Sequence, residues 1–407
     1  MKTLFAVLTA LAMALTLSAP AFADTPPEGG YDLAYYEQYK GQGLSVNVYN
    51  WGEYISNGDD GSLDVNAAFE ELTGIKVVYN TFDTNEILYA KLKTGGSSYD
   101  VIIPSDYTIA RMIEEDMLRP IDFDHVPNFR YIDPQYVNPD YDPQNRFSVP
   151  YTWGTVGLIY NTTMVDPGED METWDVLWNE KYSKNILMFG NSRDAFAIAF
   201  KRMGTSLNVQ SQEQLDEATQ MLIQQKPLVQ AYVMDEIFDK MTGGEAAIAP
   251  YYAGDFITMH ADNPDLAFAF PREGTNIFTD AMCIPKDAQN PELAELYINF
   301  MLEPQVGLAN IQYIGYSTPN AAVYDLLDDE TKQNPVQYPP KELLDTFEYL
   351  THPDPHLAKA MDDAWTKIVS ADQAYSDMLL PAVLAVCVIA IVALAVVRTV
   401  KKKRPQG

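Results

Sequence analysis

The stretch LSVNVYN at residues 44–50 alternates apolar and polar side chains, which is typical of a β-strand with one buried face. A helical pattern at residues 63–72 follows, and it ends at Gly74, a residue type that commonly closes helices. The same order then repeats, with strands predicted at 75–79 and 99–104 and helices at 85–93 and 108–117. This repetition predicts an α/β domain built on a largely parallel sheet.

The rest of the chain continues in the same class. A loop rich in Pro, Asn and Asp at 122–145 precedes an extended segment at 148–160. Further strands are predicted at 186–189 and 280–285, and further helices at 194–203, 291–302 and 355–370. About 350 residues lie between the hydrophobic ends of the chain, which is more than one ordinary domain requires and enough for two.

Both ends of the chain carry hydrophobic segments, but of different kinds. Residues 1–23 combine a basic start, an apolar run and the small-residue pattern Ala21-Phe22-Ala23, which predicts a cleaved secretory signal peptide. Residues 378–397 are uncharged and long enough to span a bilayer, and the basic residues within 398–407 indicate a cytoplasmic tail. We therefore expect an extracytoplasmic protein that is anchored to the cytoplasmic membrane by a C-terminal transmembrane helix. The body would be flanked by a flexible leader at 24–42 and a stalk at 371–377.

The charge of the chain restricts its partners. The formal net charge is −30, and all 57 acidic residues lie between the two hydrophobic segments. Nucleic acid and anionic lipid headgroups are poor partners for such a surface, whereas cations are attracted to it. The chain has two cysteines, Cys283 in the body and Cys387 in the predicted membrane span, so no disulfide is expected within the body.

Signals for catalysis or metal binding are weak. Of the four histidines, only His352 and His356 have a spacing that suits a shared metal, and Pro353 and Pro355 between them disfavour a helical face. No nucleophile elbow or phosphate-binding loop is present in the sequence. We therefore expect no catalytic residue, metal site or cofactor. A hydrolase that uses two carboxylates stays open as an alternative, because acids are abundant.

Aromatic residues stand close to carboxylates at four separated places. These are Trp51-Gly52-Glu53-Tyr54, Ser105-Asp106-Tyr107, Tyr251-Tyr252-Ala253-Gly254-Asp255 and Phe278-Thr279-Asp280. Ring faces attract an ammonium group and cover methylenes, while carboxylates neutralise the charge. The first two groups follow predicted strands, as does the segment from Asn191 to Asp194. Because open α/β sheets bind ligands beyond the carboxyl ends of their strands, this placement predicts a cleft for a small organic cation.

The chain resembles the spermidine/putrescine-binding proteins that serve ABC-type uptake systems, from about residue 44 to about residue 350. The matching runs are Tyr49-Asn50-Trp51 with Glu53-Tyr54, residues 73–77, 85–86, 88–94 and 99–100, Pro104-Ser105, Val149-Pro150-Tyr151 with Trp153-Gly154, Ile284-Pro285, residues 298–300, and residues 314–316 with 318–320. The resemblance implies a two-lobed, type II periplasmic-binding-protein-like fold with a hinged cleft. We expect one lobe at 43–156 with 278–322, and the other at 157–277 with 323–370.

The resemblance also implies which residues bind the ligand. Asp280 and Asp194 match acids that hold ammonium groups. The remaining matched cleft positions are Trp51, Tyr54, Ser105, Tyr107, Asn191, Tyr252, Phe278 and Tyr316, and Asp106 and Asp255 add carboxylates that could take part. The chain departs from the family pattern at six places: Gly52 replaces a hydroxyl residue, Asn191 replaces an acid, Asp194 replaces a longer glutamate, Tyr252 and Phe278 replace tryptophans, and Leu350 falls at a glutamine.

We therefore expect a monomeric receptor that binds spermidine, putrescine or both and delivers the ligand to ABC permease subunits. The changed acids leave the choice between these polyamines open. One alternative is a receptor for another cationic, amino-bearing solute. A sensory or adhesive surface protein with the same fold is a further alternative, besides the carboxylate hydrolase.

Overall fold

The computed structural model describes residues 30–95 and 98–371 of the chain. The signal peptide expected at 1–23 and the membrane span expected at 378–397 lie outside these residues. Within the described part, no helix is both long and apolar enough to cross a bilayer.

The strands form one continuous sheet of mixed direction, ordered β2-β1-β3-β9-β4-β7-β5-β6, with β8 paired to β4. Neighbouring strands are parallel at both ends of this order, and the strands that pair with β4 are antiparallel to it. The prediction of parallel pairing is therefore confirmed for the outer strands and wrong for the centre. The strands are β1 (Ser45–Trp51), β2 (Lys76–Phe82), β3 (Val101–Ile102), β4 (Ser148–Asn161), β5 (Ile186–Phe189), β6 (Val229–Val233), β7 (Ile248–Tyr252), β8 (Leu266–Ala269) and β9 (Ile277–Cys283).

Helices cover this sheet, and the residues at their ends explain several of their bounds. Asp64 accepts a hydrogen bond from Ala67 N at the start of α2, and Gly74 ends that helix in the left-handed conformation. Thr84 caps α3 and Asn191 caps α5 in the same way. The helices are α1 (Leu33–Tyr36), α2 (Val65–Thr73), α3 (Asn85–Lys93), α4 (Asp106–Glu114), α5 (Ser192–Arg202), α6 (Gln212–Gln225), α7 (Glu236–Thr242), α8 (Ala253–Asp262), α9 (Pro291–Met301), α10 (Pro304–Ile314), α11 (Ala321–Leu326), α12 (Asp329–Gln333), α13 (Lys341–Leu344) and residues 355–371.

The N-terminal part of the described chain differs from the sequence expectation. Residues expected within an exposed leader form α1 and the short 3-10 helix Glu37–Tyr39. Tyr36 is buried against Phe300, and its hydroxyl donates to Glu303 Oε1 at 2.6 Å. The expectation is wrong for these residues, because a tyrosine that buries its ring and satisfies its hydroxyl attaches this segment to α9 and α10.

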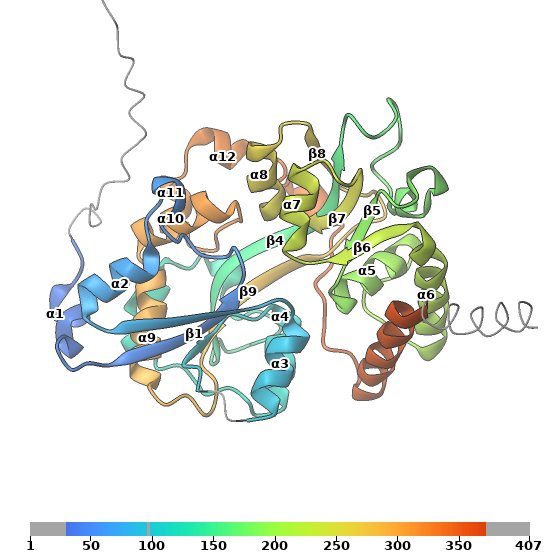
Figure 1. The fold of residues 1–407 in the computed structure, drawn as a ribbon. Coiled ribbons are helices and arrows are strands. Elements are labelled where there is room, and N and C mark those ends of the chain that lie inside the picture. Colours follow the sequence, from blue (N-terminus) through green and yellow to red (C-terminus); the bar gives the residue numbers. More distant parts are fainter. Residues whose placement is uncertain (1–29, 96–97, 372–407) are drawn as a thin grey trace, which may run out of the picture.

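The strands divide into two groups that lie side by side in the molecule (Figure 1). β1, β2, β3 and β9 pair with the first part of β4, whereas β7 and β8 pair with its last part, and β5 and β6 extend from β7. β4 therefore belongs to both halves of the molecule, and it is buried along nearly its whole length. The carboxyl ends of β1 and β5 meet where the halves join.

The chain crosses between the halves at neighbouring positions. Val156 N in β4 donates to Asn276 O, and Ile277 N donates to Glu348 O. Glu348 N in turn donates to Thr275 O, which completes a strip of three adjacent chain segments. Beyond this strip, the helix at 355–371 packs on the second half, where Trp365 contacts Phe196 of α5 and Tyr232 of β6.

Candidate functional site

A cavity of about 590 Å³ lies between the two halves of the molecule. Both strand groups contribute to its walls, and no Lys, Arg or His is among the described residues that line it. The lining residues are Trp51, Gly52, Tyr54, Asn85, Ser105, Tyr107, Asn191, Asp194, Met234, Asp235, Phe238, Tyr251, Tyr252, Asp255, Asn276, Phe278, Asp280, Tyr316 and Leu350. The structure thus brings together every predicted site residue except Asp106.

Asp280 lies in β9 and lines the cavity. It is 4% exposed, and Tyr54, which follows β1, donates its hydroxyl to Asp280 Oδ2 at 2.6 Å. Asp280 Oδ1 has no hydrogen-bond partner among the described residues. Burial raises the pKa of Asp280 to about 6, although the hydroxyls of Ser105 and Tyr54 oppose this shift. A buried carboxylate with a free acceptor oxygen is suited to a cationic hydrogen-bond donor.

Asp194 lies in the first turn of α5, on the opposite wall. Tyr252 donates its hydroxyl to Asp194 Oδ2 at 2.8 Å, and Asn191 Nδ2 donates to the same oxygen at 2.9 Å. Asn276 Nδ2 lies 3.4 Å from Asp194 Oδ1. Burial raises the pKa of Asp194 to about 7, and these hydrogen bonds only partly compensate for it. Asn191 therefore has two roles in the structure, since it both caps α5 and orients the carboxylate.

Asp255 supplies a third carboxylate from the first turn of α8. The Tyr316 hydroxyl donates to Asp255 Oδ2 at 3.1 Å. Burial raises the pKa of Asp255 well above its usual range, and the nearby charges of Asp235, Glu53 and Asp280 raise it further. Three inward carboxylates without a basic neighbour in the lining create a strongly cation-attracting cavity.

Asp106 is the predicted site residue that lies outside the lining. Its carboxylate accepts hydrogen bonds from Tyr107 N at 2.6 Å and from Thr279 N at 3.1 Å. It therefore ties the start of α4 to β9. Burial nevertheless raises the pKa of Asp106 to about 8. Its neighbours Ser105 and Tyr107 do reach the cavity, and Asn85 Nδ2 donates to both of their hydroxyl oxygens at 3.0 Å.

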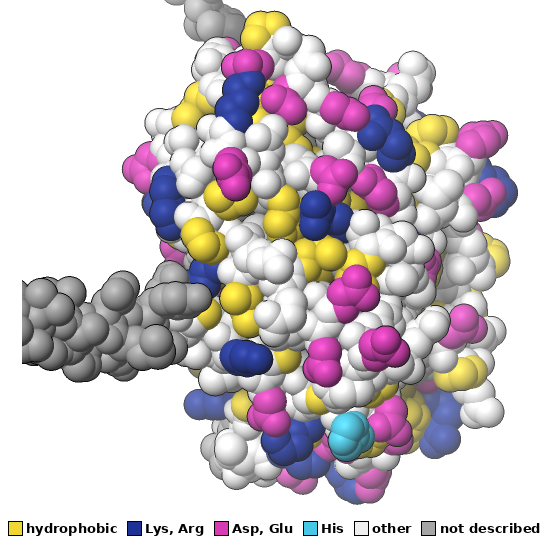
Figure 2. All heavy atoms as spheres, turned by 90° about the vertical axis from the view of Figure 1, so that its right-hand side faces the viewer, with side chains coloured by type: hydrophobic (Ala, Val, Ile, Leu, Met, Phe, Trp, Pro, Cys, Tyr) yellow, Lys and Arg dark blue, Asp and Glu magenta, His cyan; other side chains and the backbone are white. Residues whose placement is uncertain are grey.

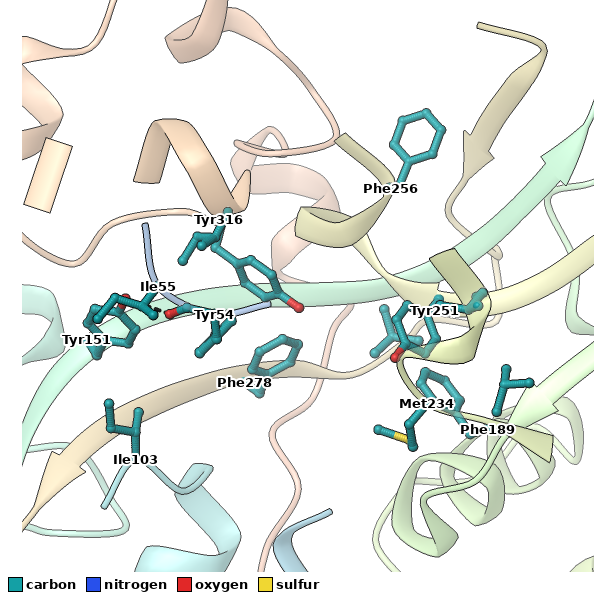
Figure 3. Close-up of a cluster of buried hydrophobic side chains, with 14 of the residues drawn as sticks. Tyr54, Ile55, Ile103, Tyr151, Phe189, Met234, Tyr251, Phe256, Phe278 and Tyr316 are labelled. Atoms are coloured by element: carbon teal, nitrogen blue, oxygen red, sulfur yellow. Dashed lines mark hydrogen bonds between the residues drawn. The ribbon is translucent and has the colours of Figure 1, made fainter. Parts of the chain in front are cut away.

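Aromatic rings surround the carboxylates. Tyr316 and Phe278 lie between Tyr54 and Tyr251 beside the paired strands β4 and β9 (Figure 3). The Tyr54 and Tyr316 ring centres are 4.7 Å apart at an interplanar angle of 89°, and those of Tyr252 and Phe278 are 5.4 Å apart at 73°. These edge-to-face pairs present both ring faces and edges to the space between them. An alkyl chain and its ammonium groups would both find favourable contacts there.

Glycines let the rings pack this closely. A Cβ at Gly254 would lie 2.2 Å from the Tyr316 ring, and one at Gly154 would lie 2.8 Å from the Phe278 ring. Neither glycine has a positive φ, so the close approach of the rings, and not the backbone conformation, requires glycine there. The ring positions therefore depend on two glycines that the sequence analysis did not single out for this role.

The sequence analysis missed several lining residues. Asp235 stands two residues after the end of β6, so the rule that placed the other residues at strand ends would have found it had β6 been predicted. Tyr251 belongs to a quoted motif but was not selected from it. The other missed residues are Asn85, Met234, Phe238 and Asn276. No group of three potential metal ligands is present within the part of the chain that the structure describes.

Comparisons with known proteins identify the family of the chain. Residues 65–339 match the family model of bacterial extracellular solute-binding proteins. The spermidine/putrescine-binding periplasmic protein of Salmonella typhimurium is 33% identical over 307 residues, which cover 75% of this chain and 86% of that protein.

Two solved structures also share the α/β periplasmic-binding-protein fold. A putative spermidine/putrescine ABC transporter protein from Listeria monocytogenes has a TM-score of 0.76 at 35% identity, covering 80% of this chain and 98% of its own. The spermidine/putrescine substrate-binding protein of Streptococcus pneumoniae has a TM-score of 0.66 at 38% identity, with the same coverage of both chains. The chain therefore belongs to the spermidine/putrescine-binding protein family of bacterial solute-binding proteins.

Proposed function

We propose that this chain binds a linear polyamine, spermidine or putrescine, in the cavity between its halves and delivers it to the permease of an ABC importer. The observation that carries the proposal is Asp280, a buried carboxylate whose Oδ1 lacks a partner among the described residues. Asn276 Oδ1, also buried and lining the cavity, lacks a donor as well. Two acceptors without donors at one site call for a ligand that donates hydrogen bonds.

The uncompensated carboxylates of the cavity favour a positively charged ligand. Burying carboxylates without counter-ions is costly, and a ligand that supplies two ammonium groups would remove much of this cost. In the proposed complex, Asp280 and Asp194 hold two ammonium groups, and Asp255 strengthens the field between them. The rings of Trp51, Tyr252 and Phe278 cover the methylenes. The family consists of solute-binding proteins and not of enzymes, so the hydrolase alternative is set aside.

The relatives support the transport role. The Salmonella protein carries spermidine and putrescine in its name, whereas the Escherichia coli relative at 29% identity is named a putrescine-binding periplasmic protein.

We propose that the halves close on the ligand about the strip of crossing segments, which places the rings and carboxylates around it. We further propose export by residues 1–23 and anchoring by residues 378–397, so that the monomeric body works outside the cytoplasmic membrane.

Titration calorimetry of the full-length chain with putrescine, spermidine, agmatine and arginine tests the proposal. Asp280→Asn is expected to weaken polyamine binding by about 30-fold or more, equivalent to about 2 kcal/mol, because a charged hydrogen bond is lost. Its free energy of unfolding should not fall, since an unneutralised buried charge is removed.

Asp100→Asn serves as the matched control. Asp100 is also fully buried, but it accepts hydrogen bonds from Asn47 and Asn290 and does not line the cavity. This variant should lose stability and keep its polyamine affinity. Binding of agmatine or arginine alone would favour a receptor for a different cation, and unchanged polyamine affinity in Asp280→Asn would contradict the proposed site.

A further inference from the structure

A fourth carboxylate, that of Asp235, lines the same cavity from a different position. Asp235 lies between the end of β6 and the start of α7, at the solvent-exposed rim. No hydrogen bond or ion pair to its side chain is found among residues 30–95 and 98–371. It is therefore not held in place by the fold in the way that Asp106 is.

Gly52, on the opposite half, gives this carboxylate its space. A Cβ at position 52 would lie 2.0 Å from Asp235 Oδ2 and 3.1 Å from its Cγ. Gly52 does not have a positive φ, so its backbone would accept other residues. The close approach of Asp235 is thus the feature that requires glycine here. Together the two residues form a contact between the halves at the rim of the cavity.

Four carboxylates line the cavity, those of Asp194, Asp235, Asp255 and Asp280. Burial raises the pKa of Asp255, and the charges of Asp235, Glu53 and Asp280 raise it further. Asp235 itself has its pKa raised to about 6 by partial burial and then by Asp83, Glu53 and Glu236. Asp194, Asp255 and Asp280 are buried, whereas Asp235 is exposed. Asp235 is therefore the lining acid that lies at the rim.

We infer that Asp235 is a specificity-determining residue, which binds the outer ammonium group of a linear triamine and makes the site prefer triamines over diamines. This inference rests on the proposed polyamine function. A diamine supplies two positive charges, which the inner acids Asp194 and Asp280 already match. A triamine adds a third charge along the same chain, and Asp235 is the remaining lining acid with no partner among the described residues. Gly52 leaves the space that the Asp235 carboxylate occupies at the rim.

Calorimetry with spermidine and putrescine on the full-length chain and its variants tests the inference. Asp235→Asn is expected to weaken spermidine binding about tenfold, because one charge-assisted contact is lost, and to weaken putrescine binding less than about threefold. Asp239→Asn is the matched control, since Asp239 is an exposed acid in α7, the helix that follows Asp235, and does not line the cavity. Its affinities for both amines should equal those of the unmodified chain.

A double-mutant cycle tests the role of Gly52. Gly52→Ala should displace the Asp235 carboxylate and weaken spermidine binding selectively, whereas Gly52→Ala combined with Asp235→Ala should be no worse than Asp235→Ala alone. Equal losses for both amines, or no loss for spermidine, would overturn the assignment of Asp235. If the unmodified chain binds neither amine, the proposed function itself fails, and this outcome is distinct from the other two.

Discussion

Two groups of charged residues meet at Tyr107, and they differ in whether basic side chains accompany the acids. On one side lies the cavity that we propose binds a polyamine, whose described lining contains carboxylates and no base. On the other side lies the Arg193 cluster, which consists of Glu86, Arg111, Arg193, His352 and Asp362. In that cluster, burial raises the pKa values of Asp362 and Glu86, but the two arginines oppose the shift of Asp362, and Arg193 also opposes that of Glu86. The fold can thus supply counter-charges between its halves, and it supplies none in the cavity lining.

On the molecular surface, acidic side chains lie near basic ones, as they do in the Arg193 cluster. On the face seen in Figure 2, acidic side chains are intermixed with lysines and arginines. Ion pairs such as Arg202 with Asp175 and Arg272 with Asp170 illustrate this mixing. The unbalanced charge of the cavity is therefore a local property and not only a result of the acidic composition. It is the property expected of a site whose counter-ion is the ligand.

The largest effect on stability is expected from replacing Arg193 in the Arg193 cluster. Arg193 is 8% exposed, donates to Thr351 O at 2.6 Å, and its guanidinium carbon lies 5.0 Å from the Tyr107 ring centre. Arg193→Met should lower the free energy of unfolding by about 2–4 kcal/mol, because it removes the hydrogen bond to Thr351 O and the counter-charge beside the half-buried Glu86. Urea denaturation of the ligand-free protein measures this change.

The matched control for Arg193 is on the same helix. Arg202 forms a partly exposed pair with Asp175, so Arg202→Met should cost less than about 1 kcal/mol. If both arginine variants lose the same free energy of unfolding, the Arg193 cluster contributes no more to stability than a surface ion pair, and this prediction is wrong.

Removing the charge of Asp194 from the cavity is expected to raise the free energy of unfolding, whereas removing Arg193 lowers it. Asp194 has its pKa raised to about 7, above an unfolded value of about 3.9, so its ionisation destabilises the folded state as the pH rises through this window. Asp194→Asn should raise the free energy of unfolding of the ligand-free protein by about 1–3 kcal/mol at about pH 8. Denaturation at about pH 8 and about pH 4.5 should show the gain shrinking at the lower pH. A loss of stability at both pH values would show that Asp194 is neutralised within the fold.

The smallest predicted effect concerns ligand affinity and pH. Because a cationic ligand favours the ionised forms of Asp280 and Asp194, with pKa values of about 6 and about 7, binding should release protons. Polyamine affinity should rise about tenfold from about pH 5.5 to about pH 8, since those carboxylates ionise in this range. Calorimetry in buffers of different ionisation enthalpy counts the released protons. If the affinity does not change with pH and no protons are released, Asp280 and Asp194 do not become ionised on ligand binding, and this prediction is wrong.

Much of this arrangement was predictable from the sequence, because the signals were local. The helix at 85–93 and the strand at 186–189 were predicted with the bounds that the structure has. The cap residue Asn191 and the strand-end positions of Trp51 and Tyr54 led to residues that do line one cavity. Placement at the carboxyl end of a strand was enough to group them, because the sheet brings those ends together.

The remaining features depend on contacts between distant segments. Asp106 stands in an aromatic–acid motif, but its carboxylate binds Tyr107 N and Thr279 N and turns away from the cavity. A sequence pattern does not specify that direction. The space that Gly52 leaves for Asp235 likewise joins two residues from different halves of the molecule. The short strand β6, which carries a polar residue among its apolar ones, gave no clear periodic signal.

The strip of crossing segments at Val156, residues 275–277 and Glu348 has a consequence for how the halves can move. Three hydrogen-bonded segments side by side bend across their width more easily than they slide past one another. We therefore expect the opening of the halves to follow essentially one angle. Asn276 belongs to this strip and also lines the cavity. We therefore expect a ligand that binds Asn276 to act directly on this axis of motion, so that its length and charge would set the angle between the halves.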